Sequence, residues 1–215
     1  MAARQGPAVP AEGRRSLEVR WILPGRLEPA VVGWFGRFPA EMASREDAYL
    51  LDPDLSGLSV KVRAEEALEV KAYHGSPGIL DIPGRARGRI QSWQKWSFPL
   101  SSPTRDGGNL PGWALIRKRR RIARFRLASG RVVTADPPLA TGPECAVELT
   151  EFGAGGRTWW SVGFEATGPA DLLHSALQAT AILVFGQALP GPVELSMDCC
   201  QSYAQWLARH REPAA

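Results

Sequence analysis

Charged side chains recur two positions apart in several segments of this sequence. The pairs are Glu18 and Arg20, Lys61 and Arg63, Glu69 and Lys71, and Lys118 and Arg120. Successive side chains of a β-strand point to opposite faces, so the two members of each pair would share one face of a strand. The net charge of +4 and the pI near 9.2 favour anionic partners such as nucleic acid, nucleotides or polyphosphates.

Apolar residues occupy the positions between and beside these charges. They include Leu17, Val19, Val60, Val62, Leu68 and Val70. Two arrangements fit this alternation. The charged faces form an ordinary solvated surface, or the strands close into a barrel with a charged lumen and pack their apolar faces outward against helices. A charged lumen is costly unless opposite charges or a ligand compensate it, and the mixture of acids and bases supplies such compensation. The alternation alone leaves both arrangements open.

The elements that would position these charges are mostly strands. The chain has 22 glycines and 18 prolines among 215 residues, which favours short strands joined by turns. Alternation and turn signals predict strands over 16–22, 58–63, 67–73, 89–98, 113–127, 131–135, 145–152 and 158–166. Helices are predicted over 27–38, 169–188 and 198–210. Residues 45–57 and the stretch from 74 through Gly88 are predicted as loops.

Six segments resemble motifs of the CYTH family, also called triphosphate tunnel proteins. They are SLEVR (16–20), similar to the family's ExExK strand, YLLDPDLSGLSVKVR (49–63), LEVKAY (68–73), IRKRRRI (116–122), VELTEFGAGGRTWWSVGFEA (147–166) and SYAQWL (202–207). Each motif is short. Their order and spacing carry the resemblance, which covers about residues 16–210.

The resemblance implies an α+β fold, an antiparallel eight-stranded β-barrel or tunnel with flanking helices. It would occupy residues 16–211 as a single domain that follows a flexible tail over 1–15. The implied ligand is a triphosphate or polyphosphate-like anion, bound by Arg20, Lys61, Arg63, Lys71, Lys118 and Arg120. The implied metal ligands are Glu18, Glu148 and Glu165, which would hold Mg²⁺ or Mn²⁺ in a metal-dependent triphosphatase.

Two departures from the family pattern affect the acidic half of this site. Ser16 stands where the first glutamate of the ExExK strand is expected, and Gly163 stands where the penultimate acid of the last strand is expected. Anion binding depends on many cations, whereas metal placement depends on a few carboxylates. We therefore expect anion binding with slow or absent metal-dependent hydrolysis, and whether the chain is an enzyme stays open. The alternative is a non-catalytic basic β-rich protein that binds a polyanion, nucleic acid or a protein partner.

The sequence contains no motif that is typical of several other functional classes. The run from Arg117 to Arg121 could contact nucleic acid phosphates, but no helix-turn-helix, zinc finger or RNA-recognition signature surrounds it. On a strand, Trp93 and Trp96 would point to opposite faces, where packing is the expected role and stacking on a base the alternative. No Walker loop or nucleophile elbow is present. No apolar run reaches the roughly 18–20 residues that span a bilayer, so no membrane partner is expected and the cytoplasm is the expected location.

Overall fold

The computed structural model describes residues 13–55, 57–100, 112–128, 130–135 and 142–210. The strands are β1 (Arg14–Pro24), β2 (Glu41–Leu50), β3 (Leu58–Arg63), β4 (Ala67–Tyr73), β5 (Gly78–Ile82), β6 (Ala86–Pro99), β7 (Trp113–Ala128), β8 (Arg131–Thr134), β9 (Glu144–Ala154) and β10 (Arg157–Thr167). The α-helices are α1 (Pro29–Phe35), α2 (Leu173–Phe185) and α3 (Tyr203–Arg209), and 3₁₀ turns cover Pro53–Leu55 and Ala170–Leu172.

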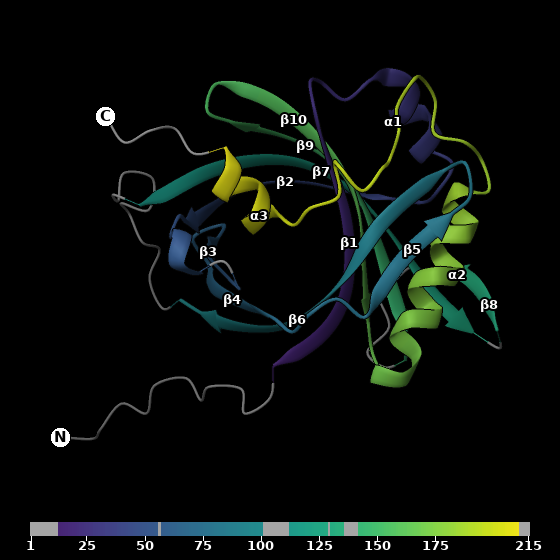
Figure 1. Ribbon diagram of the computed structural model, residues 1–215, viewed down its shortest axis with the longest axis horizontal. Coiled ribbons are helices and arrows are strands. Elements are labelled where there is room, and N and C mark those ends of the chain that lie inside the picture. Colours follow the sequence, from purple (N-terminus) through teal and green to yellow (C-terminus); the bar gives the residue numbers. More distant parts are fainter. Residues whose placement is uncertain (1–12, 56, 101–111, 129, 136–141, 211–215) are drawn as a thin grey trace.

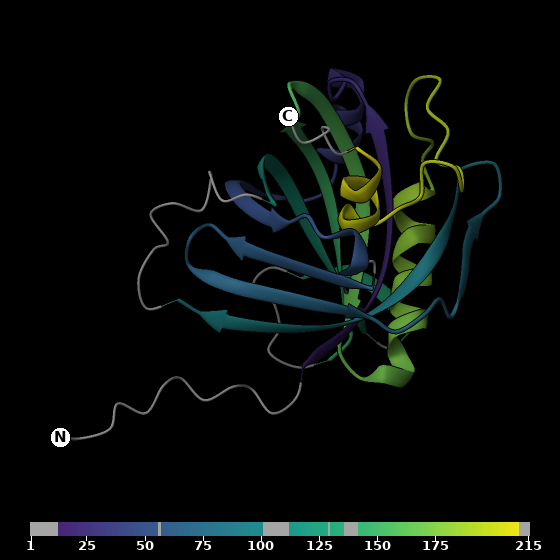
Figure 2. The ribbon, with the colours of Figure 1, turned by 60° about the vertical axis from the view of Figure 1, so that its left-hand side comes forward.

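Eight of these strands close into an antiparallel barrel. Their order is β1-β10-β9-β7-β2-β3-β4-β6, and β6 pairs with β1 to complete the ring. The other two strands lie outside the ring, with β5 on β6 and β8 on β7. Figure 1 and Figure 2 show the barrel strands curving around one central space. The predicted eight-stranded barrel with flanking helices is confirmed.

Two strands of the fold contradict the predicted loops. β2 covers Glu41–Leu50, although 45–57 was predicted as loop, and β5 lies within the stretch predicted as loop before Gly88. β2 carries charged residues on both faces, Arg45 and Asp47 on one and Glu46 on the other, so no clear alternation of polar and apolar residues marks it. β2 pairs with β7 over ten residues and with β3, and this cross-strand pairing, which is not local, defines it.

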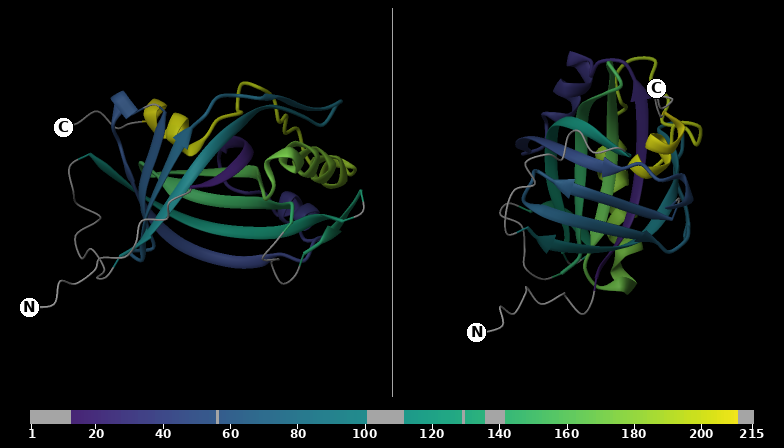
Figure 3. Two further views of the ribbon diagram at one scale, coloured as in Figure 1. Left: turned by 90° about the horizontal axis from the view of Figure 1, so that it is seen from below. Right: turned by 90° about the vertical axis from the view of Figure 1, so that its left-hand side faces the viewer.

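An apolar core lies outside the barrel, between its outer face and two helices. Val19 and Trp21 of β1 and Phe164 of β10 point outward and pack against α2, whose Phe185 meets the Trp21 ring edge-on at 6.0 Å. Figure 3 shows α2 running alongside the barrel. The four outward residues Val60, Val62, Leu68 and Val70 differ, because they are half-buried and belong to neither core cluster of the described residues. The predicted outward packing against helices therefore holds for β1, β7, β9 and β10, and not for these residues of β3 and β4.

A second apolar cluster closes one end of the barrel interior. Helix α3 begins with a capping box in which Ser202 and Gln205 bond each other's backbone. This helix inserts Trp206 and Leu207 among inward residues of the strands. The strand residues of the cluster are Ile22, Tyr49, Ile116 and Phe152. We call this the blind end of the tunnel. The helix predicted within 198–210 is present, but it is shorter and covers Tyr203–Arg209.

The predicted domain limits are only partly covered by the described residues. β1 begins at Arg14, two residues before the expected start of the domain, and residues 1–12 of the expected tail lie outside the described part of the chain. Residue 211, the expected end of the domain, lies outside it as well. Within the described residues, no helix has the length and apolarity needed to cross a membrane.

Candidate functional site

The barrel interior is a charged tunnel with basic side chains in excess. Two adjoining cavities, of about 90 and 340 Å³, share lining residues such as Arg20 and Lys71. The basic residues that line them in the described chain are Arg14, Arg20, Arg45, Lys61, Arg63, Lys71, Lys95, Lys118, Arg120 and Arg124. The acidic ones are Glu18, Glu41, Glu69, Glu144, Glu148 and Glu165. The larger cavity opens at the end away from α3, and we call that opening the mouth.

All six cations predicted as ligand-binding residues line this tunnel. Alternation on β1, β3, β4 and β7 turns Arg20, Lys61, Lys71, Lys118 and Arg120 inward, where their side chains are at most 19% exposed. Arg63 lies farther out, with 46% of its side chain exposed. The solvated-surface arrangement of these charges is therefore wrong, and the charged-lumen arrangement is correct.

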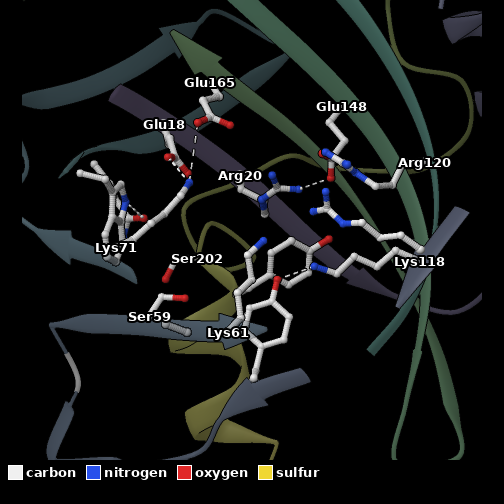
Figure 4. A pocket seen from close by; sticks show the side chains of 16 residues that line it. Glu18, Arg20, Ser59, Lys61, Lys71, Lys118, Arg120, Glu148, Glu165 and Ser202 are labelled. Atoms are coloured by element: carbon white, nitrogen blue, oxygen red, sulfur yellow. Dashed lines mark hydrogen bonds and ion pairs between the residues drawn. The ribbon is translucent and has the colours of Figure 1, made fainter. Parts of the chain in front are cut away.

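Lys71 lies between two of the acids predicted as metal ligands. Its Nζ is 2.5 Å from Oε1 of Glu18 and 3.7 Å from Oε1 of Glu165. Figure 4 shows the Lys71 side chain reaching both carboxylates. The ammonium group, against the effect of burial, lowers the pKa of Glu165 to about 2. Burial alone would lower the pKa of Lys71, but Glu165 and Glu18 raise it above its ordinary value.

Glu148, the third predicted metal ligand, is enclosed by two guanidinium groups. Arg120 donates to Oε2 of Glu148 from both Nε and Nη2, and Arg20 donates to Oε1 from Nη1 at 3.3 Å. Thr150 donates to the same Oε1 at 2.6 Å. Burial would raise the pKa of Glu148, but Arg20 and Arg120 outweigh it and hold this pKa well below its ordinary value. Glu148 is thus an ionised carboxylate whose two oxygens already have donors.

Lys118 lies deepest, next to the blind end. Its Nζ donates to the Tyr49 hydroxyl at 2.5 Å and to Oδ2 of Asp47 at 3.2 Å, and it lies 3.9 Å from the centre of the Tyr203 ring. Burial lowers the pKa of Lys118 well below its ordinary value, although Asp47 opposes this effect. Lys61 reaches the same Asp47 at 3.5 Å and also pairs with Glu69 at 3.0 Å. The inner part of the tunnel therefore combines two amines with two phenols.

Several residues of the tunnel interior were not predicted from the sequence. Arg45, Asp47 and Tyr49 come from β2, which lacks the alternation that marks a strand, and Tyr203 comes from α3. Lining residues near the mouth, among them Lys95 and Arg124, also carried no motif. Polar residues such as Ser44 and Glu46 alternate with Arg45 and Asp47, so β2 offered no local signal that separates its two faces. Of the two tryptophans weighed for stacking, Trp93 is buried and lines the inner cavity, and Trp96 lies half-buried on the opposite face.

The carboxylates of the tunnel do not form an available metal site. Hard cations such as Mg²⁺ and Mn²⁺ need several free oxygen ligands in a compact set. Here Glu18 and Glu165 share Lys71, and Glu148 accepts from Arg20 and Arg120. Within the described ranges, no three acidic, histidine or cysteine side chains are grouped so that they could hold a metal ion. The donor set as arranged does not fit Mg²⁺ or Mn²⁺, and the metal role of these glutamates stays a prediction.

The paired carboxylates predict that stability falls in acid. The pKa of Glu69, lowered by Lys61 and Lys95 against the effect of burial, is about 2, as is that of Glu165, whereas the ordinary value is 4.5. Between these values the unfolded chain binds more protons than the folded chain. The stabilisation is therefore fully present above pH 4.5 and is lost as the pH falls toward 2. Urea unfolding at a series of pH values measures this loss.

A matched variant tests the source of the acid sensitivity. Glu69→Gln removes one of the titrating groups, so its free energy of unfolding should be lower at neutral pH and change less between pH 4.5 and 2. Glu65→Gln, at an exposed residue of the turn between β3 and β4, serves as the control with the native pH dependence. A native free energy of unfolding that stays constant from neutral pH down to 3 would contradict this prediction.

Comparisons with known proteins return solved structures but no close relative. No family model matches the sequence, and no curated protein matches it. A structure of an RNA triphosphatase from S. pombe is 13% identical, with a TM-score of 0.41 over 80% of this chain and 78% of that chain. The PH1819 protein from Pyrococcus horikoshii is 11% identical, with a TM-score of 0.45 over 90% of this chain and 99% of that chain.

A third structure is a putative adenylyl cyclase from Hippeastrum that is described as having a dominant triphosphatase activity. It is 11% identical to this chain, with a TM-score of 0.43 over 90% of this chain and 95% of that chain. Sequence identities and TM-scores this low say nothing of what the present chain binds. Any functional conclusion has to come from the side chains of the tunnel.

Proposed function

We propose that this chain binds a triphosphate or a similar polyanion inside its tunnel, and that metal-dependent hydrolysis of this ligand is slow or absent. The observation that carries the proposal is the excess of basic over acidic side chains on the walls of one enclosed tunnel. Guanidinium and ammonium groups that converge from several strands match the oxygen atoms of a polyphosphate chain. Each ion pair inside the tunnel uses up part of this charge, and the excess remains for a ligand.

The shape of the tunnel supports one orientation of the ligand. Trp206 and Leu207 close the blind end with an apolar layer, and the larger cavity leads to the mouth. A triphosphate would therefore place its terminal phosphoryl group near Lys118 and Arg20, with any organic group directed toward the mouth. This orientation accommodates inorganic triphosphate, a nucleoside triphosphate or another organic triphosphate.

The same site supports only weak metal-assisted chemistry. A divalent ion stabilises developing charge and activates water when it has a fixed set of oxygen ligands. The tunnel carboxylates are engaged by Lys71, Arg20 and Arg120, and Gly163 contributes no carboxylate. Anion affinity is spread over many cations and does not depend on this missing set.

We expect tripolyphosphate to bind the purified full chain more tightly than orthophosphate does. Tripolyphosphate can contact Lys118 and Lys71 together, whereas orthophosphate contacts only one of these two lysines. Isothermal titration calorimetry with both anions at physiological ionic strength measures the difference. Phosphate release from tripolyphosphate and from nucleoside triphosphates, with Mg²⁺ or Mn²⁺ added, measures turnover and should be slow or undetectable.

Two outcomes would contradict this proposal. Equal affinity for the two anions, or no binding of either, would contradict the binding of a polyanion in the tunnel. Fast metal-dependent turnover that Glu165→Gln abolishes would establish an enzyme with an intact metal site.

The alternative of nucleic acid binding finds less support in the outward arginines of β7. Arg117 is paired with Glu46, and Arg119 is paired with Glu151. Two of the three outward arginines of the run therefore lie beside an acid, whereas Arg121 forms no ion pair with the described residues. The excess positive charge of the tunnel lies in the lumen, which is closed to a duplex. Binding to duplex DNA that is tighter than binding to tripolyphosphate at physiological salt would favour this alternative.

A further inference from the structure

The guanidinium of Arg20 lies directly on Gly163 in the middle of the tunnel wall. The two residues face each other across β1 and β10, and Gly163 is in turn opposite Glu148 on β9. A β-carbon added at Gly163 would lie 2.7 Å from Cζ of Arg20 and 2.9 Å from both of its Nη atoms. Contacts this short are too close for these atoms, so any side chain at 163 would displace the guanidinium from its present position.

The present position of Arg20 therefore depends on the absence of a side chain at residue 163. The sequence resemblance led us to expect an acid at 163, and its carboxylate would project into the space that the guanidinium fills. A carboxylate at 163 and the guanidinium in its present place exclude one another. In this chain the space that such an acid would occupy therefore holds the guanidinium of Arg20.

The surroundings hold this cation in place. Arg20 donates from Nη1 to Glu148 at 3.3 Å and to Ser161 at 3.1 Å, and its Cζ lies 4.6 Å from the centre of the Tyr203 ring. Both hydrogen bonds to described residues use Nη1, which leaves Nη2 for an oxygen of a ligand. Burial opposes the charged form of Arg20, but Tyr203 and Glu148 raise its pKa above the ordinary value, so it stays charged.

We propose that Arg20, seated on Gly163, supplies the central positive charge of the tunnel in place of a divalent cation, so that triphosphate binds without metal. This inference rests on the proposed function and deepens it. Nη2 of Arg20 can donate to a phosphate oxygen as a charged group, whereas Mg²⁺ would need oxygen ligands that the tunnel has already paired. The carboxylates that a metal would require serve here to hold Arg20, Arg120 and Lys71.

The test combines ligand binding without metal and metal binding without ligand. Calorimetry with tripolyphosphate in excess EDTA should show binding by the native chain. Arg20→Ala should weaken this binding by at least about tenfold, which corresponds to the loss of one charged contact. Arg117→Ala, which removes an outward arginine of β7, is the matched control and should bind as the native chain does. Electron paramagnetic resonance of Mn²⁺ with protein alone should show only the free ion.

A double variant tests the exclusion directly. Arg20→Ala combined with Gly163→Glu vacates the guanidinium space and places a carboxylate beside Glu148 and Glu165. This double variant should bind Mn²⁺ in the resonance experiment, whereas Arg20→Ala alone should not. Circular dichroism verifies that each variant is folded. Gly163→Ala, a smaller change in the same space, gives a second measurement if the double variant does not fold, and it should weaken metal-free binding by displacing Arg20.

The outcomes separate this inference from the proposed function. Binding of tripolyphosphate by the native chain only when Mn²⁺ is present overturns the inference and leaves the polyanion tunnel standing. Binding of Mn²⁺ by the native chain without any anion also overturns it. No binding of tripolyphosphate with or without metal overturns both.

Discussion

Replacing Arg120 by alanine should weaken tripolyphosphate binding by about a hundredfold, while replacing Arg117 should leave it unchanged. Arg120 and Arg117 lie on the same strand, β7, but they point to opposite faces. The Arg120 side chain is 15% exposed and lines the tunnel, whereas the Arg117 side chain is 82% exposed on the outer surface. A charged hydrogen bond contributes roughly 1.5–3 kcal/mol, and the loss of Arg120 also leaves Glu148 with less compensation, which adds repulsion toward an anion.

The measurement is calorimetric titration of both variants with tripolyphosphate at fixed salt, because ionic strength changes every charged contact. Arg120→Lys is a useful intermediate, since it keeps the charge but loses the two-point contact with Glu148. Its affinity should fall between those of the native chain and Arg120→Ala. Equal losses for Arg120→Ala and Arg117→Ala would show that the anion binds by overall charge and not in the tunnel.

Replacing Trp206 by alanine should lower the free energy of unfolding by about 3–5 kcal/mol, the range found when a large aromatic residue is removed from a core. Trp206 is 1% exposed, and its ring meets Phe152 and Trp159 edge-on at 5.2 Å each. It also stacks on His210. Because these contacts close the blind end of the tunnel, their loss removes the wall behind Lys118 as well.

Urea denaturation of the native chain and the variant measures this loss. Trp206→Phe is the matched control, since it keeps most of the packed ring. The indole Nε1 of Trp206 has no hydrogen-bond partner among the described residues, so phenylalanine removes a buried polar group that is unpaired there. A change below about 1 kcal/mol for Trp206→Ala would show that α3 does not form part of the folded core.

The sequence predicted the inward charges of several strands because alternation is a local property. Apolar residues separate Lys61 from Arg63 on β3 and Glu69 from Lys71 on β4. The charged face of such a strand points either into the barrel or toward solvent. The resemblance to a tunnel family then favoured the inward one. The helix that carries Trp206 and Leu207 was also predicted, although over the longer range 198–210.

What the sequence did not predict depends on contacts between distant strands. β2 has polar residues on both faces, so Arg45, Asp47 and Tyr49 could be assigned to the tunnel only once β2 was seen to pair with β7 and β3. The contact between the guanidinium of Arg20 and Gly163 depends on the register of β1 and β10, which no local pattern specifies. From the sequence Gly163 was a missing acid, and only the structure shows that its space is filled.

The apolar packing at the end of the tunnel away from the mouth bears on the order in which molecules leave it. In the described part of the chain, Trp206 and Leu207 pack against Ile22, Ile116 and Phe152 behind Lys118. If products leave by the mouth, a fragment that lies near Lys118 has to follow any fragment that lies nearer the mouth. If a triphosphate were split in the orientation proposed above, orthophosphate would be trapped behind diphosphate until the diphosphate departed. Release of diphosphate would then limit turnover, and added diphosphate would delay the release of orthophosphate.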